Sequence, residues 1–105
     1  MKRIETIIRN SQLKEVRSSL HKLGVEFITY NDIVGIGKEK SSNHFKVNEY
    51  ETRIIPRVNI SFLFEDEFVD NAVDTIIKAA SDKEQGDGKI YISTIDELVN
   101  IQSGR

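Results

Sequence analysis

Residues 56–80 read PRVNISFLFEDEFVDNAVDTIIKAA, a strand pattern that passes directly into a helix pattern. Val58, Ile60, Phe62 and Phe64 alternate with Asn59, Ser61, Leu63 and Glu65, which is typical of a strand with one buried face. Pro56 stands at the expected entrance of this strand, where its missing N–H does least harm. Apolar residues then recur at helical spacing over residues 69–80, and Asp66 is placed to cap that helix. The stretch predicts a half-buried strand followed by an amphipathic helix.

The start of the chain repeats this order of patterns. Residues 4–9 predict a first strand, and the apolar residues within 13–23 recur near the helical period. Asn10 or Ser11 can cap the helix, because a short polar side chain accepts hydrogen bonds from the free N–H groups of the first turn. Gly24 can end it, because glycine tolerates the left-handed conformation.

The remaining segments complete two similar halves. Residues 25–34 are rich in β-branched and aromatic side chains and predict a second strand. A polar stretch without a sustained period follows and predicts a long exposed loop over about residues 37–54. Residues 89–93 predict a fourth strand. Residues 95–101 fit a short helix or a fifth strand, and the pattern does not decide between them.

The order β-α-β, long loop, β-α-β is that of the ferredoxin-like fold. We therefore expect one α+β domain over residues 1–105, with an antiparallel sheet and both helices on one face.

Composition excludes several classes of protein. The chain has 105 residues, with 15 basic and 17 acidic side chains and a net charge of -2, which argues against nucleic acid as a partner. It has no cysteine, so disulfides and thiolate catalysis are absent. No apolar run is long enough to span a bilayer, and the charged N-terminus does not resemble a signal peptide. We expect a cytoplasmic protein with no direct membrane insertion.

The sequence gives little support for a catalytic site. His21 falls on the solvated side of the first predicted helix and His44 in the long loop, so they do not form a metal-binding pair. The adjacent acids at 65–66 and 96–97 fall at predicted helix starts, where capping explains them. The sequence does not indicate an enzyme.

Two glycine segments are better candidates for a site. GIGK at residues 35–38 follows a strand, and GDGK at residues 86–89 precedes one. Glycines let backbone N–H groups converge on an anion, and an adjacent lysine adds positive charge. Neither segment is a Walker A loop or a dinucleotide fingerprint. Together they suggest an anion site at the strand ends.

Several segments also stand in the order of one known family. The opening MKRIETIIR (1–9) and GIGK (35–38) look like that family's opening and its Gly-Phe-Gly-Arg segment. EY (49–50) matches the end of its Tyr-Arg-Gly-Ala-Glu-Tyr loop motif. GDGKIY (86–91) fits its most specific signature, Gly-Asp-Gly-Lys-Ile-Phe, and SG (103–104) is similar to a Thr-Gly near its end. The chain resembles the PII nitrogen-regulatory signalling family over nearly its whole length.

This resemblance implies a homotrimer of ferredoxin-like subunits that binds ATP or ADP in the clefts between subunits. Many members sense 2-oxoglutarate through a magnesium ion held by ATP. The long loop then docks on a regulated target protein, which is a transporter, an enzyme or a regulator.

The resemblance also assigns roles to residues by position. The phosphates would be held by Gly35, Gly37, Lys38, Gly86, Asp87, Gly88 and Lys89. The adenine would be lined by Ile7, Thr29 and Leu63. Glu39 stands where the family has its magnesium-ligating glutamine, Arg57 and Lys40 fall in the effector region, and Tyr50 stands where some members are uridylylated.

The chain departs from the family pattern in ways that leave an alternative open. Asn100 and Gln102 replace two arginines that contact nucleotide phosphates, and a charged hydrogen bond is worth roughly 1.5–3 kcal/mol. The alternative is an interaction module whose site is lost or altered and takes another small anion, such as bicarbonate, or another nucleotide. A ferredoxin-like enzyme or RNA-binding domain is a third reading, which the balanced charge disfavours.

Overall fold

The computed structural model describes residues 1–40, 50–81 and 88–104. Its four strands are β1 (Lys2–Ile8), β2 (Thr29–Lys40), β3 (Tyr50–Phe64) and β4 (Lys89–Thr94). Its two helices are α1 (Leu13–Leu23) and α2 (Val69–Ala80), each preceded by a short 3-10 turn, at Asn10–Gln12 and Asp66–Phe68.

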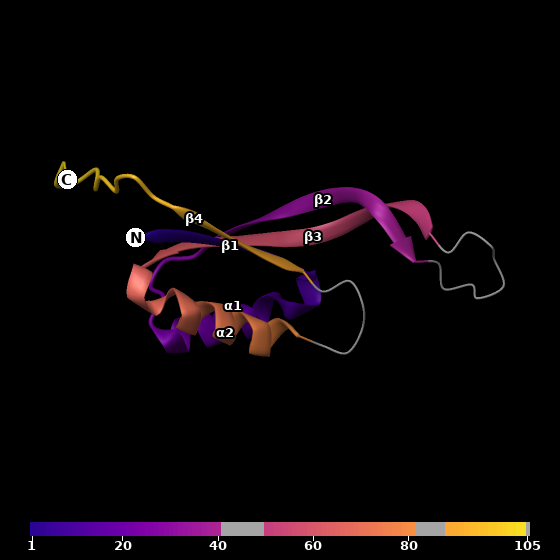
Figure 1. The fold of residues 1–105 in the computed structure, drawn as a ribbon, viewed down its shortest axis with the longest axis horizontal. Helices are drawn as coiled ribbons and strands as arrows, with labels where there is room; N and C mark the ends of the chain where they lie inside the picture. The colour runs from indigo at the N-terminus through magenta and orange to yellow at the C-terminus, as the bar shows by residue number, and fades with distance from the viewer. Residues whose placement is uncertain (41–49, 82–87, 105) are drawn as a thin grey trace.

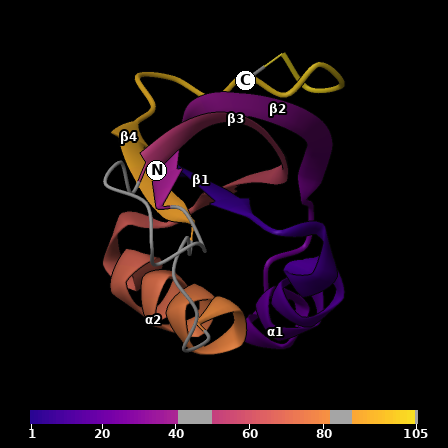
Figure 2. The ribbon, with the colours of Figure 1, turned by 90° about the vertical axis from the view of Figure 1, so that its right-hand side faces the viewer.

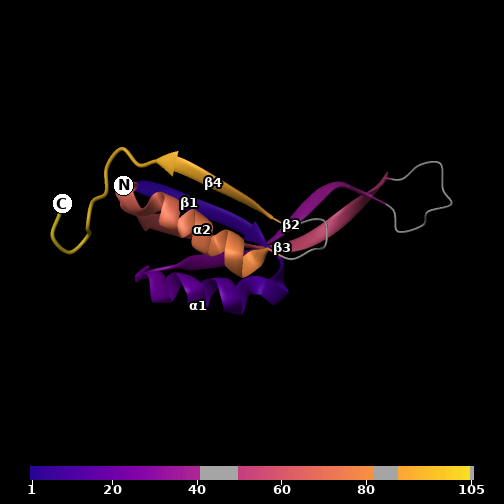
Figure 3. The same ribbon diagram turned by 60° about the horizontal axis from the view of Figure 1, so that its bottom comes forward.

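The strands form one antiparallel sheet in the order β2-β3-β1-β4. Both helices cover the same face of the sheet and lie side by side (Figures 1, 2 and 3). The α+β ferredoxin-like prediction is confirmed.

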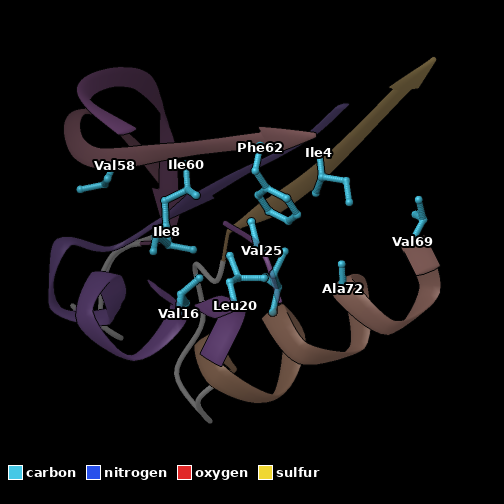
Figure 4. Close-up of a cluster of buried hydrophobic side chains, with 11 residues drawn as sticks. Ile4, Ile8, Val16, Leu20, Val25, Val58, Ile60, Phe62, Val69 and Ala72 are labelled. Carbon is cyan, nitrogen blue, oxygen red and sulfur yellow. The ribbon is translucent and has the colours of Figure 1, made fainter. Parts of the chain in front are cut away.

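The core lies between the sheet and the helices, and Figure 4 shows its side chains. Alternate residues of β1 and β3, such as Ile4 and Ile60, face the helices and are fully buried. Val16 and Leu20 of α1 and Ala72 of α2 meet them from the other side. Burying one such aliphatic side chain contributes about 1.5–3 kcal/mol, so this layer holds the sheet on its helices.

The loop between the two halves is shorter than the sequence predicts, because both adjoining strands are longer. Strand pairing continues through Gly37↔Arg53 to Lys40↔Tyr50, so residues 37–40 and 50–54 belong to strands and not to the predicted loop. This two-stranded arm projects beyond the helices (Figure 1). The sequence of the arm is mostly polar and shows no hydrophobic alternation, so the pattern did not reveal these strands.

Two strand boundaries also differ from the prediction. Pro56 lies inside β3, opposite Val34, and not at its entrance. Pairing of β3 with β1 extends only as far as Val58↔Ile8, so one edge of β3 is open at Pro56, where a missing N–H is tolerated. β2 begins at Thr29 because the preceding segment crosses from α1 to the sheet and buries Val25. Gly24 has a φ of 111° and ends α1 as predicted.

The first helix is not capped by Asn10 or Ser11. The Gln12 side chain accepts a hydrogen bond from the backbone N–H of Arg9 at 3.0 Å and donates one to the backbone carbonyl of Ala80. Gln12 therefore ties the start of α1 to the end of α2. The sequence pattern cannot distinguish a glutamine that hydrogen-bonds to another helix from an ordinary exposed polar residue.

Replacing Gln12 by alanine is expected to lower the free energy of unfolding by about 1–2 kcal/mol, because the change removes both hydrogen bonds. Urea denaturation measures the difference. Asn10→Ala and Ser11→Ala are the matched controls and should leave stability nearly unchanged. If Asn10→Ala or Ser11→Ala lowered the free energy of unfolding more than Gln12→Ala does, the predicted cap at Asn10 or Ser11 would be correct.

Asp66 does not cap α2 through its side chain. Its carboxylate pairs with the N-terminal ammonium of Met1, and the hydrogen bond from this ammonium lowers the pKa of Asp66. The ion pair thus supports the fold above the ordinary pKa of aspartate, and this support is lost as the pH falls through the lowered value.

Residues 95–104 form neither the short helix nor the fifth strand that the sequence left open. The segment leaves β4 through a hydrogen bond from the Ile95 N–H to the Met1 carbonyl at 3.2 Å. It continues as an irregular tail at the end of the molecule opposite the arm (Figure 1).

Candidate functional site

Most described candidate residues lie on the sheet face that the helices leave uncovered, which we call the open face. In β1, Ile4 and Ile8 point to the helices, so Ile7 points to the open face. Strand register places further candidates on that face: Thr29, Arg57, Leu63 and Lys89. The open face is therefore the surface on which to look for a site.

One group of candidates gathers where β1 ends and β4 begins. Ile7 pairs with Lys89 of β4 on one side and with Asn59 of β3 on the other. The buried hydroxyl of Thr6 donates a hydrogen bond to the Lys89 carbonyl at 3.2 Å, which fixes the backbone of the first residue of β4. Arg57 lies two residues along β3 from Asn59. We call this group the lysine end of the open face.

Gly88 brings the chain into the lysine end through an unusually close approach. A Cβ atom added to Gly88 would overlap the backbone carbonyl of Ile7 and press on the backbone N of Ile8. Any side chain at this position would push the start of β4 away from β1. The glycine is therefore required by packing within the chain itself.

Gly35 and Gly37 are different, because nothing in the described chain requires them to be glycine. Neither has a φ in the left-handed region. A Cβ on Gly35 would make an ordinary contact of 3.7 Å with the Ile55 carbonyl, and one on Gly37 would meet nothing within 4 Å. Their effect is to leave a stretch of β2 backbone uncovered beyond the lysine end, where another molecule can approach it.

The second group lies at the other end of the open face, around a hollow of about 640 Å³. Thr29 and Leu63 line it, and the Thr29 hydroxyl donates a hydrogen bond to the Ser61 carbonyl at 3.3 Å. Arg3 of β1 and Asn100 of the tail also line it. We call this group the hollow end.

A single copy of the chain keeps the two ends apart. Leu63 pairs with Arg3, whereas Lys89 pairs with Ile7, so they lie four positions apart along β1. At about 3.3 Å per residue this is about 13 Å. The resemblance predicts that Ile7 lines the adenine together with Thr29 and Leu63. Within one copy of the chain, however, Ile7 lies beside Lys89 and not beside those two residues.

The remaining candidates are placed only in part. Lys38, Glu39 and Lys40 occupy β2 opposite Thr52, Glu51 and Tyr50 of the arm. Gly86, Asp87 and His44 lie outside the described residues.

The sequence did not single out several residues that line the hollow end, among them Arg3, Phe27 and Ser61. The alternation in residues 58–65 could have placed Ser61 beside Leu63 on one face. Phe27 offered no such signal, because it lies in the irregular segment between α1 and β2.

Within residues 1–40, 50–81 and 88–104, no three His, Asp or Glu side chains are grouped so as to hold a metal ion. His21 is exposed on α1, as predicted. None of the helices in these ranges is long and apolar enough to cross a membrane.

Comparison with known proteins agrees with the fold and identifies a family. The family model "Nitrogen regulatory protein P-II" matches residues 1–105. The nitrogen regulatory protein P-II of Azospirillum brasilense is 36% identical over 105 residues, which cover 99% of this chain and 94% of the relative. That of Pyropia yezoensis is 39% identical over 104 residues, covering 98% of this chain and 93% of the relative.

A solved structure shows the same architecture. The structure of Bacillus subtilis GlnK superposes with a TM-score of 0.82 at 24% sequence identity, covering 99% of this chain and 92% of that chain. The chain therefore belongs to the nitrogen regulatory protein P-II family, whose members are signalling regulators and not enzymes.

Proposed function

We propose that this protein binds an adenine nucleotide in clefts between copies of the chain and signals the bound state to a partner protein through the β2–β3 arm. The observation that carries the proposal is the placement of the candidate residues at two opposite ends of one open sheet face. The lysine end offers charge and uncovered backbone, and the hollow end offers a recess. Neither end alone makes a complete nucleotide site.

A head-to-tail assembly would join these two ends. When the hollow end of one copy meets the lysine end of the next, the contact is heterologous, and such contacts form a closed ring when the rotation between successive copies closes. The family resemblance implies a ring of three. Each cleft of such a ring would combine the base-sized recess of one subunit with the phosphate-binding groups of its neighbour.

The charges at both ends suit a polyphosphate. Lys89 is exposed, and its ammonium group forms no hydrogen bond or ion pair with any part of the chain that the structure describes. Arg57 adds a second cation at the lysine end. Arg3 adds one at the hollow end, where it pairs with Glu5 at 2.6 Å. Arg3 lines the same hollow as Asn100, the position at which the family resemblance implies an arginine.

Magnesium and 2-oxoglutarate would join the nucleotide beside β2 and β3, between Arg57 and the outer residues of the arm. The Glu39 carboxylate is an oxygen ligand of the kind that magnesium prefers, and this ion keeps few protein ligands when it is held by phosphates. Arg57 and Lys40 are the cations proposed for the effector. When bound, the metal would screen the repulsion between Glu39 and the phosphates.

The arm is the proposed route to a target protein. Ile36 and Ile54 pair between β2 and β3 at the base of the arm and are 78% and 74% exposed. Exposed apolar pairs of this kind suit contact with another protein. A ligand would act by shifting the arm between two states, to the extent that it binds them with different affinity. Tyr50 is the proposed modification position on the arm.

Isothermal titration calorimetry with ATP, ADP and AMP tests nucleotide binding, with and without magnesium and 2-oxoglutarate. We expect saturable heat with ATP or ADP and a change in affinity when magnesium and 2-oxoglutarate are present together. If no nucleotide produced heat under any of these conditions, the sensor function would be rejected and the fold would remain.

Replacing Gly37 by alanine is expected to weaken ATP binding about tenfold and to leave the melting temperature unchanged. The added methyl group meets no atom of the chain within 4 Å, so any effect comes from blocking a ligand at the backbone. Ile36→Ala is the matched control, since Ile36 lies on the opposite face of β2. Equal affinities for wild type and Gly37→Ala would show that the nucleotide does not approach this backbone.

A second candidate function is an interaction module whose site takes a different small anion. The observation that favours it is Asn100, an uncharged residue on the wall of the hollow end. Under this alternative, the double variant Asn100→Arg with Gln102→Arg gains ATP binding that the wild type lacks. Equal binding of ATP by both proteins would reject it.

A further inference from the structure

Phe27 stands out because its environment differs from that of its neighbours. It lies in the segment that joins α1 to β2, in which Val25 is buried and Ile28 packs against the core. Phe27 is 77% exposed and lines the hollow end. A large aromatic ring therefore remains exposed at the edge of a recess, although the nearby apolar side chains of Val25 and Ile28 pack in or against the core.

The groups around Phe27 match the chemistry of a nucleobase. Leu63 gives the recess a half-buried apolar wall, and the backbone of β2 and β3 at Thr29 and Ser61 borders it. An aromatic ring attracts other flat rings through offset stacking. A heteroaromatic base offers such a face together with polar edges, whereas an aliphatic ligand offers neither.

We propose that Phe27 is the stacking residue for the purine base of the bound nucleotide, an inference that rests on the proposed function. The ring at the mouth of the hollow end covers one face of the base, and Leu63 contacts it from the recess. The phosphates then extend toward the lysine end of the neighbouring copy. Phe27 thus acts on the base alone, whereas Lys89 acts on the phosphates alone.

Stacking on an aromatic side chain tolerates any base, because every base has a π face. Phe27 therefore adds affinity without selecting adenine over guanine. Its removal should weaken binding of ATP and of GTP by the same factor, about ten- to hundredfold. Any preference for adenine would have to come from groups at the edge of the base.

The absence of tryptophan from the sequence allows a direct test, since an indole placed at position 27 is the sole tryptophan fluorophore. In Phe27→Trp we expect ATP to quench the emission in a saturable manner. Tyr30→Trp, at an exposed position on the helix side of β2, is the matched control and should not respond. Calorimetry should show tight binding in Phe27→Tyr and weak binding in Phe27→Ala.

The outcomes separate this inference from the proposed function. If wild type binds ATP, but Phe27→Ala binds it equally well or the indole of Phe27→Trp does not respond, then Phe27 is not the stacking residue and the proposed function stands. Blue-shifted emission of Phe27→Trp without nucleotide, together with no response to ATP, would place Phe27 inside a contact between copies and also reject the inference. If wild type binds no nucleotide, both proposals fail.

Discussion

Gly88→Ala is expected to lower the free energy of unfolding by about 3 kcal/mol and to displace the start of β4. The methyl group would occupy the space of the Ile7 carbonyl, a backbone atom in the middle of a sheet that cannot move aside. Overpacking a rigid site costs about 1–3 kcal/mol and occasionally more, and backbone overlap belongs at the upper end. The hydrogen bond from Thr6 to the Lys89 carbonyl would be lost as well.

Thermal and urea denaturation measure this effect, and amide hydrogen exchange in β4 locates it. Gly35→Ala is the matched control, since its methyl group makes only an ordinary 3.7 Å contact with the Ile55 carbonyl. An unchanged melting temperature for Gly88→Ala would contradict the close approach of β4 to β1.

Lys89→Ala is expected to weaken ATP binding about ten- to hundredfold, because a charged hydrogen bond to phosphate is worth roughly 1.5–3 kcal/mol. Stability should not change, since the exposed ammonium group has no partner among the residues that the structure describes. The loss should be greater for ATP than for adenosine, because the lysine reaches only the phosphates. Calorimetry with both ligands measures the difference.

Lys78→Ala is the control for net charge, because Lys78 lies on α2 and its loss removes the same charge far from the open face. An equal loss of ATP affinity in both variants would mean that general charge, and not a contact at the lysine end, attracts the nucleotide.

The parts of the fold that bury apolar surface could be predicted from the sequence. The alternation around Ile60 and the helical spacing around Leu20 follow from which side chains must leave water, and both residues are fully buried. Gly24 was placed correctly for a similar reason, because a left-handed turn at the end of a helix favours glycine.

The parts that depend on backbone pairing or on distant contacts could not be predicted. The outer arm is held by β2–β3 pairing over a polar sequence, so its strands resembled a loop. Gln12 and Asp66 act on partners at Ala80 and Met1, and no local pattern indicates such contacts. The sequence of residues 95–101 fitted both a helix and a strand, and in the structure this segment forms neither.

The candidate site, too, could be predicted only where it depends on local motifs. Its glycines and Lys89 were found from motifs, but the motifs did not indicate that Ile7 and Leu63 lie at different ends of the open face. Register alone supplies that separation. Phe27 escaped notice because a single exposed aromatic residue in an irregular segment forms no pattern.

Binding by mixed assemblies of two defective variants tests the central claim that the site is shared between copies. Thr29→Glu blocks the hollow end, and Lys89→Ala removes the phosphate contact at the lysine end. The two variants are co-expressed with different affinity tags, purified through both tags, and titrated with ATP. In a closed ring of three, each mixed assembly regains one intact cleft, so we predict wild-type affinity at about one third of the sites. Mixed assemblies that bind no better than either variant alone would contradict a site shared between copies.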